Sequence, residues 1–146
     1  MKTLHKSVLV AHSARRMREL VEDIEKYPAF LPWCDHATIL SAEGQVVRAS
    51  IRIRYRGLNT AFTTENHGLA DQAIEMRLVE GPFRTLLGVW RFGALDNHAS
   101  KVTFDLSYEF SNMAIALIAG PVFHKISDEL VDAFVRRADD LYGDSA

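Results

Sequence analysis

The sequence predicts an α+β fold in which a curved antiparallel sheet of about six to seven strands wraps around a long C-terminal helix, with two short helices after the first strand. Two patterns support this fold class. From about His36 to Phe110, apolar and polar residues alternate with a period of two, as in strands with one buried and one solvated face. From Asn112 to about Tyr142, apolar residues recur every three or four positions, as on one side of a helix.

The chain has 146 residues, 48% of them hydrophobic and 25% charged, which fits one domain with a single core over residues 1–146. Its net charge of -2 gives no overall attraction to nucleic acid or anionic lipid, so such a partner would need a local basic patch. Cys34 is the only cysteine, which excludes an internal disulfide and is typical of a reducing compartment. The longest apolar run, Met113 to Ala119, is shorter than the roughly 20 residues of a membrane-spanning helix, so we expect a cytoplasmic protein.

The N-terminal part is expected to form one strand and two short helices. Leu4 to Val10 alternate as a strand, and Ser13 is a suitable N-cap for a helix over Ala14 to Glu25. Tyr27-Pro28 should end that helix, because proline disfavours the α conformation at the residue before it. A second short helix or turn is expected over Ala29 to Trp33, between two prolines.

The alternation that predicts strands is clearest from Val47 to Arg56. Apolar or aromatic residues at its odd positions are assigned to the core, and arginine or serine residues at its even positions to solvent. The later predicted strands are Leu58–His67, Ile74–Leu78, Leu86–Phe92 and Lys101–Phe110, separated by Gly57, Gly68 and Gly81-Pro82. Thr64 and Asn66 are exceptional, since they are polar on the face that alternation assigns to the core.

The C-terminal helix has a predicted buried stripe of Phe123, Ile126, Leu130, Phe134 and Leu141. Pro121 lies inside this helix, where it removes a backbone donor and clashes with the preceding turn. We therefore expect a kink or break near Gly120-Pro121. The apolar segment from Met113 to Val122 is the best candidate for a mobile gate, or for contact with a membrane surface.

Three segments resemble the coenzyme Q-binding protein family, and they occur in that family's order. The first is Tyr27-Pro28-Ala29-Phe30-Leu31-Pro32-Trp33-Cys34, which resembles the signature after the family's first helix. Gly81-Pro82-Phe83, followed by Leu87-Gly88-Val89-Trp90-Arg91-Phe92, resembles its central hairpin. Leu130-Val131-Asp132-Ala133-Phe134-Val135-Arg136-Arg137-Ala138 resembles its C-terminal helix motif, so the similarity covers nearly the whole chain.

This family belongs to the START-like, helix-grip superfamily, which also contains lipid-transfer domains and polyketide cyclases. The resemblance implies a carrier or chaperone that binds ubiquinone, or a related polyprenyl quinone or lipid, in an internal cavity and supports respiration. It also implies an alternative, because bacterial members include a ribosome association toxin thought to block joining of the ribosomal subunits. A polyketide cyclase-like enzyme is a third interpretation, which rests on the superfamily alone. No cofactor is expected, apart from ubiquinone as a bound ligand.

The inward aromatic residues can line a ligand cavity as readily as they can form an ordinary core. Thr64 and Asn66 could donate hydrogen bonds to quinone carbonyls, because buried polar groups need partners. The predicted ligand-binding set is Tyr27, Phe30, Trp33, Tyr55, Phe62, Thr64, Asn66, Met76, Phe83, Trp90, Phe92, Phe104, Tyr108, Phe123, Leu130 and Phe134. The alternatives are a plain core, hydrogen bonding of the polar pair to backbone, or an error in strand register.

Two groups of basic residues are candidates for contact with rRNA or with phospholipid headgroups. The first, which we call the arginine stripe, lies on the solvated face of one strand and consists of Arg48, Arg52, Arg54 and Arg56. The second, on the first predicted helix, consists of Arg15, Arg16 and Arg18. The alternative is a merely solvated face, which is the more common meaning of such residues, with neutralisation by Glu65, Glu75 and Glu80.

No catalytic or metal site is expected, and the protein is predicted not to be an enzyme. Cys34 and His36 are close in sequence, but no second pair has the spacing of metal ligands, and no acid is placed to orient a nucleophile. Glu65 and His67 share a strand face, but that face is expected to be solvated. The sequence leaves the oligomeric state open.

Overall fold

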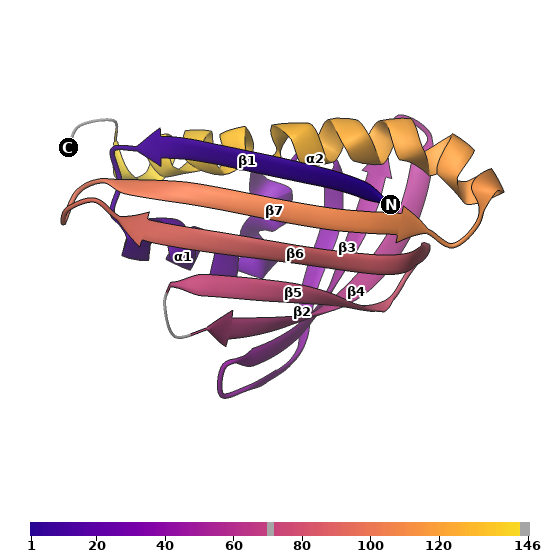
Figure 1. The fold of residues 1–146 in the computed structure, drawn as a ribbon, viewed down its shortest axis with the longest axis horizontal. Coiled ribbons are helices and arrows are strands. Elements are labelled where there is room, and N and C mark those ends of the chain that lie inside the picture. The colour runs from indigo at the N-terminus through magenta and orange to yellow at the C-terminus, as the bar shows by residue number, and fades with distance from the viewer. Residues whose placement is uncertain (70–71, 144–146) are drawn as a thin grey trace.

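The computed structural model describes residues 1–69 and 72–143. Seven antiparallel strands form one sheet in the order β1-β7-β6-β5-β4-β3-β2. They are β1 Lys2–Val10, β2 Cys34–Glu43, β3 Val46–Tyr55, β4 Leu58–Leu69, β5 Ala73–Glu80, β6 Phe83–Ala94 and β7 Ser100–Phe110. The sheet curves around the long helix α2, Met113–Tyr142 (Figure 1). The predicted helix-grip fold is therefore confirmed.

The first strand closes the order by pairing with the last one. β1 runs antiparallel to β7, with Lys2 opposite Tyr108 and Val10 opposite Ser100. Lys6 is the polar exception on the inward face of β1, and its Nζ lies 3.0 Å from an Asp128 carboxylate oxygen of α2. The charge that interrupts the apolar face of the strand is thus paired with the helix that the sheet encloses.

The region after β1 differs from the prediction. Helix α1, Ala14–Glu22, begins where expected, with the Ser13 side chain accepting from the Arg16 N–H, but it ends before Glu25. A 3₁₀ helix, η1, follows over Ile24–Ala29; of the short helix or turn predicted over residues 29–33, the turn is present at residues 32 and 33. A 3₁₀ helix has three residues per turn, so it places Ile24 and Tyr27 on the same buried side.

The strand β4 continues through Gly68, which was predicted to interrupt it. The Gly68 N–H donates to the Gln45 carbonyl oxygen over 2.7 Å, so this residue takes part in pairing with the neighbouring hairpin. A side chain at this position would collide with Gln45, whose Oε1 lies 2.5 Å from where a Cβ would stand. Glycine is therefore present for close packing rather than to end the strand.

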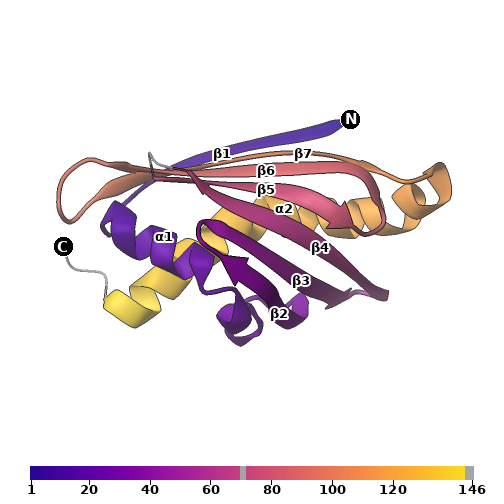
Figure 2. The same cartoon turned by 90° about the horizontal axis from the view of Figure 1, so that it is seen from below.

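Helix α2 begins after the N-cap Asn112 and runs to Tyr142, so of the kink or break predicted near Gly120-Pro121 the break is absent. Proline leaves the carbonyl one turn earlier without its donor, but the residue there, Leu117, is 73% exposed, so water can replace the missing N–H. The first turns are inclined to the rest of the helix in both views (Figure 1 and Figure 2). Within the described residues, no helix is long and apolar enough to cross a membrane.

The buried side of α2 faces the concave side of the sheet, and α1 lies beside its C-terminal half on that same side (Figure 2). Phe123, Ile126 and Phe134 are buried as predicted, whereas Leu141 is 50% exposed. Val131 and Ala138 continue the buried side in place of Leu141. The outer face of the sheet stays open to solvent, so the concave face, which the helices cover, is where the fold can enclose a site (Figure 2).

Candidate functional site

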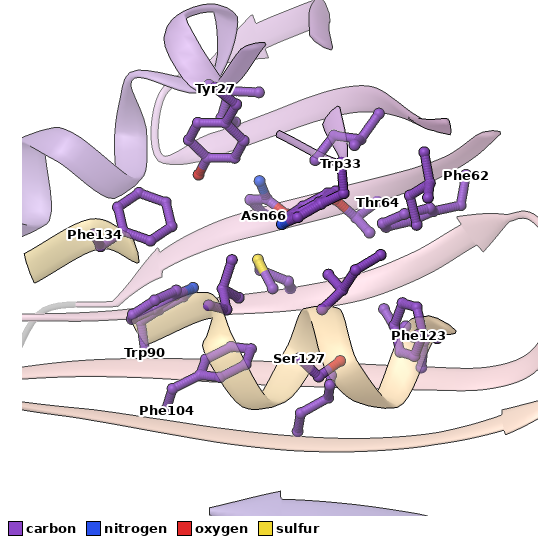
Figure 3. A pocket seen from close by; sticks show the side chains of 18 residues that line it. Tyr27, Trp33, Phe62, Thr64, Asn66, Trp90, Phe104, Phe123, Ser127 and Phe134 are labelled. Carbon is purple, nitrogen blue, oxygen red and sulfur yellow. The ribbon is translucent and has the colours of Figure 1, made fainter. Parts of the chain in front are cut away.

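A cavity of about 80 Å³ lies between the concave face of the sheet, η1 and α2 (Figure 3). Its walls are almost entirely apolar side chains. A cavity needs about 10–15 Å³ to hold one water molecule, so this one is large enough to hold water. Pockets for drug-sized ligands are commonly about 300–1,000 Å³. A larger ligand therefore requires the lining side chains to move.

Most of the residues predicted to bind a ligand line this cavity. They are Tyr27, Trp33, Phe62, Thr64, Asn66, Met76, Trp90, Phe104, Phe123, Leu130 and Phe134. They come from η1, the turn after it, four strands and α2, so the fold brings together residues that are far apart in the sequence. Figure 3 shows the labelled members of this group around the open space.

Three predicted residues lie elsewhere because they pack against other rings. Phe83 stacks on Phe110 with 5.0 Å between ring centroids, and the same separation joins it to Phe123. Tyr108 packs edge-on against Phe123 at 4.7 Å. Phe92 stacks beside Trp90 at 6.1 Å and is itself fully buried. These rings form solid core next to the cavity.

Phe30 and Tyr55 lie at the margins of the structure rather than in the cavity wall. Phe30 packs against Phe134 on one side, and on the other side carries the Arg137 guanidinium 5.1 Å from its centroid. Tyr55 ends strand β3 and is similarly covered by the Arg56 guanidinium at 5.2 Å. Both rings are therefore placed between core and solvent.

The prediction missed seven lining residues: Ile24, Ile51, Ile53, Leu86, Leu106, Ile126 and Ser127. The strand residues among them lie on the same inward face as the predicted aromatic residues, so the alternation of each strand could have identified them. Ser127 lies one helical turn after Phe123 and could have been found from helical spacing. The prediction favoured aromatic residues, although aliphatic side chains line such walls equally well.

Thr64 and Asn66 do face the cavity, and the strand register predicted for them is correct. Their side chains bond to each other, since the Thr64 hydroxyl donates to Asn66 Oδ1 over 2.9 Å. The Asn66 amide nitrogen and the indole N–H groups of Trp33 and Trp90 form no side-chain hydrogen bond within residues 1–69 and 72–143, and they are not fully enclosed, because no fully buried side-chain nitrogen or oxygen there lacks a partner. In Figure 3 the indole nitrogen of Trp90 points toward the open space. The polar groups left for a ligand are therefore mainly donors.

Tyr27 stands at the η1 side of the cavity and is held rigidly. Its hydroxyl donates to the Val21 carbonyl at the end of α1. Burial, with smaller contributions from Cys34 and Asp23, raises the pKa of Tyr27 far above its usual range. The Tyr27 hydroxyl therefore stays protonated, and its hydrogen bond joins η1 to α1.

Of the two pairs considered from the sequence, Cys34 and His36 do not bond through their side chains, whereas Glu65 and His67 do. The Cys34 thiol donates weakly to the His36 carbonyl oxygen over 3.6 Å, while the His36 ring bonds the Thr38 hydroxyl instead. Burial raises the pKa of Cys34 to about 11, so it is a thiol and not a thiolate at neutral pH. Across the described ranges, no group of three His, Cys, Asp or Glu side chains is arranged to hold a metal ion.

Glu65 belongs to the outer face of the sheet. Its carboxylate accepts from Arg48 over 3.0 Å and lies 2.8 Å from His67 Nε2. The hydrogen bonds from Arg48 and then from His67 hold the pKa of Glu65 below its usual range. This pair therefore belongs to a solvent-facing ionic cluster rather than to the cavity.

Arg48, Arg52 and Arg54 of the arginine stripe project from the outer face of β3, Arg56 follows in the turn to β4, and all four side chains are exposed. Arg48 is paired with Glu65, but Arg52, Arg54 and Arg56 form no ion pair with any residue that the structure describes. Glu75, expected to neutralise the stripe, pairs with Arg77 instead. The positive charges of Arg52 and Arg54 thus stay available on one strand face, while the Arg56 guanidinium lies over the Tyr55 ring.

The second basic group, on α1, is mostly committed to local contacts. Arg15 pairs with Glu19 over 3.0 Å and Arg18 with Glu22 over 3.4 Å. Arg16 lies over the Tyr142 ring at 4.8 Å from its centroid. The arginine stripe is therefore the stronger candidate for an anionic partner.

Comparison with known proteins places this geometry in a family. The family model described as polyketide cyclase / dehydrase and lipid transport matches residues 10–135. The chain is 40% identical over 144 residues to the ribosome association toxin RatA of Vibrio cholerae, covering 99% of this chain and 100% of that protein. The RatA protein of Pseudomonas aeruginosa is 38% identical over 140 residues, with 96% and 97% coverage.

More distant proteins share the fold. A mitochondrial coenzyme Q-binding protein homologue of Xenopus laevis is 26% identical over 141 residues, covering 94% of this chain and 58% of that protein. The Zhui aromatase/cyclase from a Streptomyces species superposes with a TM-score of 0.82 at 17% identity, covering 94% and 93% of the chains. A START superfamily protein from Mycobacterium smegmatis gives 0.80 at 22% identity, with 95% and 98% coverage. The chain therefore belongs to the polyketide cyclase / dehydrase and lipid transport family, and within it to the RatA group.

Proposed function

We propose that this protein binds a ribosomal subunit, in line with the name ribosome association toxin that its RatA relatives carry, and that it does so in the cytoplasm without catalysing a reaction. The similarity to those relatives over nearly the whole chain is the observation that carries the proposal. The arginine stripe supplies a suitable surface, because Arg52, Arg54 and Arg56 are exposed and unpaired among the described residues. Phosphate groups of rRNA attract such side chains.

Co-sedimentation with purified ribosomal subunits tests this proposal. Changing Arg52 and Arg54 together to Gln should weaken association and reduce the slope of log affinity against log salt by about 2, one for each lost phosphate contact. Folding should hardly change, since exposed charged residues contribute about 0–1 kcal/mol.

The matched control changes Arg77 and Arg91 to Gln, because both are exposed on the outer face of β5 and β6 and carry the same total charge. Equal loss of binding in both double variants would indicate a general charge effect. A wild-type protein that sediments with neither subunit would contradict the proposal.

A second function is supported by the cavity itself: binding of an apolar ligand that carries hydrogen-bond acceptors. The walls are apolar, and the unpartnered donors of Trp33, Asn66 and Trp90 match carbonyl oxygens such as those of a quinone. The exposed apolar residues Met113 and Leu117 at the start of α2 support membrane contact for such a carrier. Ribosome association and ligand binding use different surfaces and can occur in one protein.

Tryptophan fluorescence measures this second function directly, because the chain has two tryptophans and both line the cavity. A ubiquinone with one isoprene unit should quench the emission saturably. Native mass spectrometry of the purified protein identifies any lipid that it retains. Emission that stays unchanged while equilibrium dialysis shows binding would place the ligand outside the cavity.

A further inference from the structure

A second cavity of about 90 Å³ lies between the end of α1 and the turn that joins β2 to β3. Four residues border both cavities: Ile24, Tyr27, Asn66 and Met76. They form a partition between the two spaces. Met76 is the most adaptable member of this partition, because its unbranched side chain can take many shapes. A small movement of Met76 and Asn66 would join the two spaces into one channel.

The second cavity differs from the main one in chemistry. Its wall contains the carboxylate of Glu22 and the amides of Gln45 and Asn66 beside apolar groups such as Val21. Amides both donate and accept hydrogen bonds. The Glu22 charge is matched by Arg18, whose Nε lies 3.4 Å from its carboxylate, so the wall carries no unmatched charge from this pair.

Arg18 lies beside three wall residues of the second cavity, Glu22, Gln45 and Gly68, without lining the cavity itself. Arg18 reaches from α1 to β4, where its Nη1 lies 3.4 Å from the Leu69 carbonyl oxygen. Its Nη2 also lies 2.9 Å from where a Cβ of Gly68 would stand, next to the Gln45 side chain. The hydrogen bond from Arg18 to Leu69 is long and is therefore weak. Arg18 nevertheless keeps only 16% of its side chain exposed, whereas Arg15 keeps 85%.

We propose that the second cavity is the entrance to the main cavity and the binding site for the uncharged polar end of an elongated amphipathic ligand. The apolar body of that ligand lies in the main cavity, so the inference rests on the ligand-binding function proposed above. An uncharged head, such as a hydroxyl or an amide, fits because the amides offer donors and acceptors while the nearby charges are already matched. Entry at α1 also differs from entry at the Met113–Val122 segment, which the sequence suggested.

Displacement of the fluorescent apolar probe N-phenyl-1-naphthylamine tests the head-group preference. The competitors are 1-decanol, decanoate and decylamine, which share one chain and differ in the head. We expect 1-decanol to bind at least 5-fold more tightly than either charged competitor. Gln45→Ala should weaken the binding of 1-decanol about 2- to 10-fold, the range for one lost hydrogen bond, and leave the affinity for the probe unchanged. Asn59→Ala is the control, because Asn59 is an exposed amide that borders neither cavity.

Stopped-flow measurement of probe binding tests the entrance. Arg18→Gln should raise both the association and dissociation rates severalfold with little change in affinity, since it removes a contact between α1 and β4 and no ligand contact. Arg15→Gln is the matched control on the same helix, and it should change neither rate. Leu117→Ser tests the alternative entrance at the start of α2.

The outcomes separate the two proposals. A probe that does not bind at all overturns the ligand-binding function and this inference together. A probe that binds, with competitors that show no preference for the uncharged head, overturns only the polar subsite. Rates that respond to Leu117→Ser and not to Arg18→Gln overturn the entrance at α1.

Discussion

The space between the sheet and α2 is solid at one end and hollow at the other. Near the start of the helix, Phe83, Tyr108, Phe110 and Phe123 pack with ring centroids between 4.7 and 6.2 Å apart. Further along the helix, Trp33, Asn66 and Trp90 surround the cavity of about 80 Å³. Both ends are built from inward residues of strands that alternate in the same way.

The helix accounts for this difference. At the packed end α2 contributes Phe123, which fills the space among three other rings. One turn later it contributes Ser127, a small residue that faces the cavity (Figure 3). The space opposite Ser127 stays open, because the packed side chains around it can relax only partially to fill it. The position of the cavity is therefore decided by residue size on α2 rather than by the strand pattern.

The largest effect is expected from truncation at the packed end. Phe83 is 6% exposed and contacts rings on all sides, so Phe83→Ala should lower the free energy of unfolding by about 3–5 kcal/mol. Chemical denaturation measures this loss. Leu87→Ala, on the outer face of the same strand, is the control and should cost only about 0.5 kcal/mol. Equal losses for the two variants would mean that the packed end is not tightly filled.

Phe134 distinguishes the two ends more finely, since it belongs partly to each. Its ring is 1% exposed and lies 5.2–5.4 Å from the rings of Tyr27, Phe30 and Trp90, but one side borders the cavity. Phe134→Ala should therefore lower the free energy of unfolding by about 2–3 kcal/mol, less than Phe83→Ala, because fewer packing contacts disappear.

The same variant should bind the naphthylamine probe more tightly, because it enlarges a cavity that is small for a two-ring ligand. Fluorescence titration of the folded protein measures this affinity. A loss as large as that of Phe83→Ala, with unchanged probe affinity, would place Phe134 wholly in the core.

Strand alternation predicted the fold well because burial on one face imposes a period of two. On β7, Val102, Phe104, Leu106, Tyr108 and Phe110 are all buried, and the residues between them are not. The same pattern could not separate Phe104, which lines the cavity, from Tyr108, which does not. That difference depends on which α2 side chain lies opposite each residue, and this is tertiary information.

The helical regions show where local rules were overruled. Pro28 was expected to end the first helix, but α1 already ends at Glu22 and Pro28 lies inside η1. Asp23 carries the change, since its N–H bonds to the carbonyl oxygens of both Glu19 and Leu20. The 3₁₀ helix places Ile24 and Tyr27 together on the buried side, and Pro28 is compatible with this backbone geometry.

Filling the cavity at the hollow end should change stability least and ligand binding most. Ser127 is 4% exposed, and its side chain faces the cavity. Ser127→Leu places a branched apolar side chain into the open space, where it gains contacts that the serine lacks. Cavity filling of this kind commonly stabilises a protein by about 0.5–2 kcal/mol. We expect about 1 kcal/mol here, together with at least a 10-fold loss of probe affinity.

Ser127→Ala is the matched control, because it removes the hydroxyl without filling the space. It should leave probe affinity nearly unchanged, and paired denaturation and titration of both variants measure the contrast. If the space were already filled by movement of Met76 or Leu130, leucine would overpack it and destabilise the protein by about 1–3 kcal/mol. That result, with probe binding retained, would mean that the hollow end is packed like the end around Phe83. Stabilisation with lost binding would instead tie the ligand site to the single small residue that keeps the helix from filling its groove.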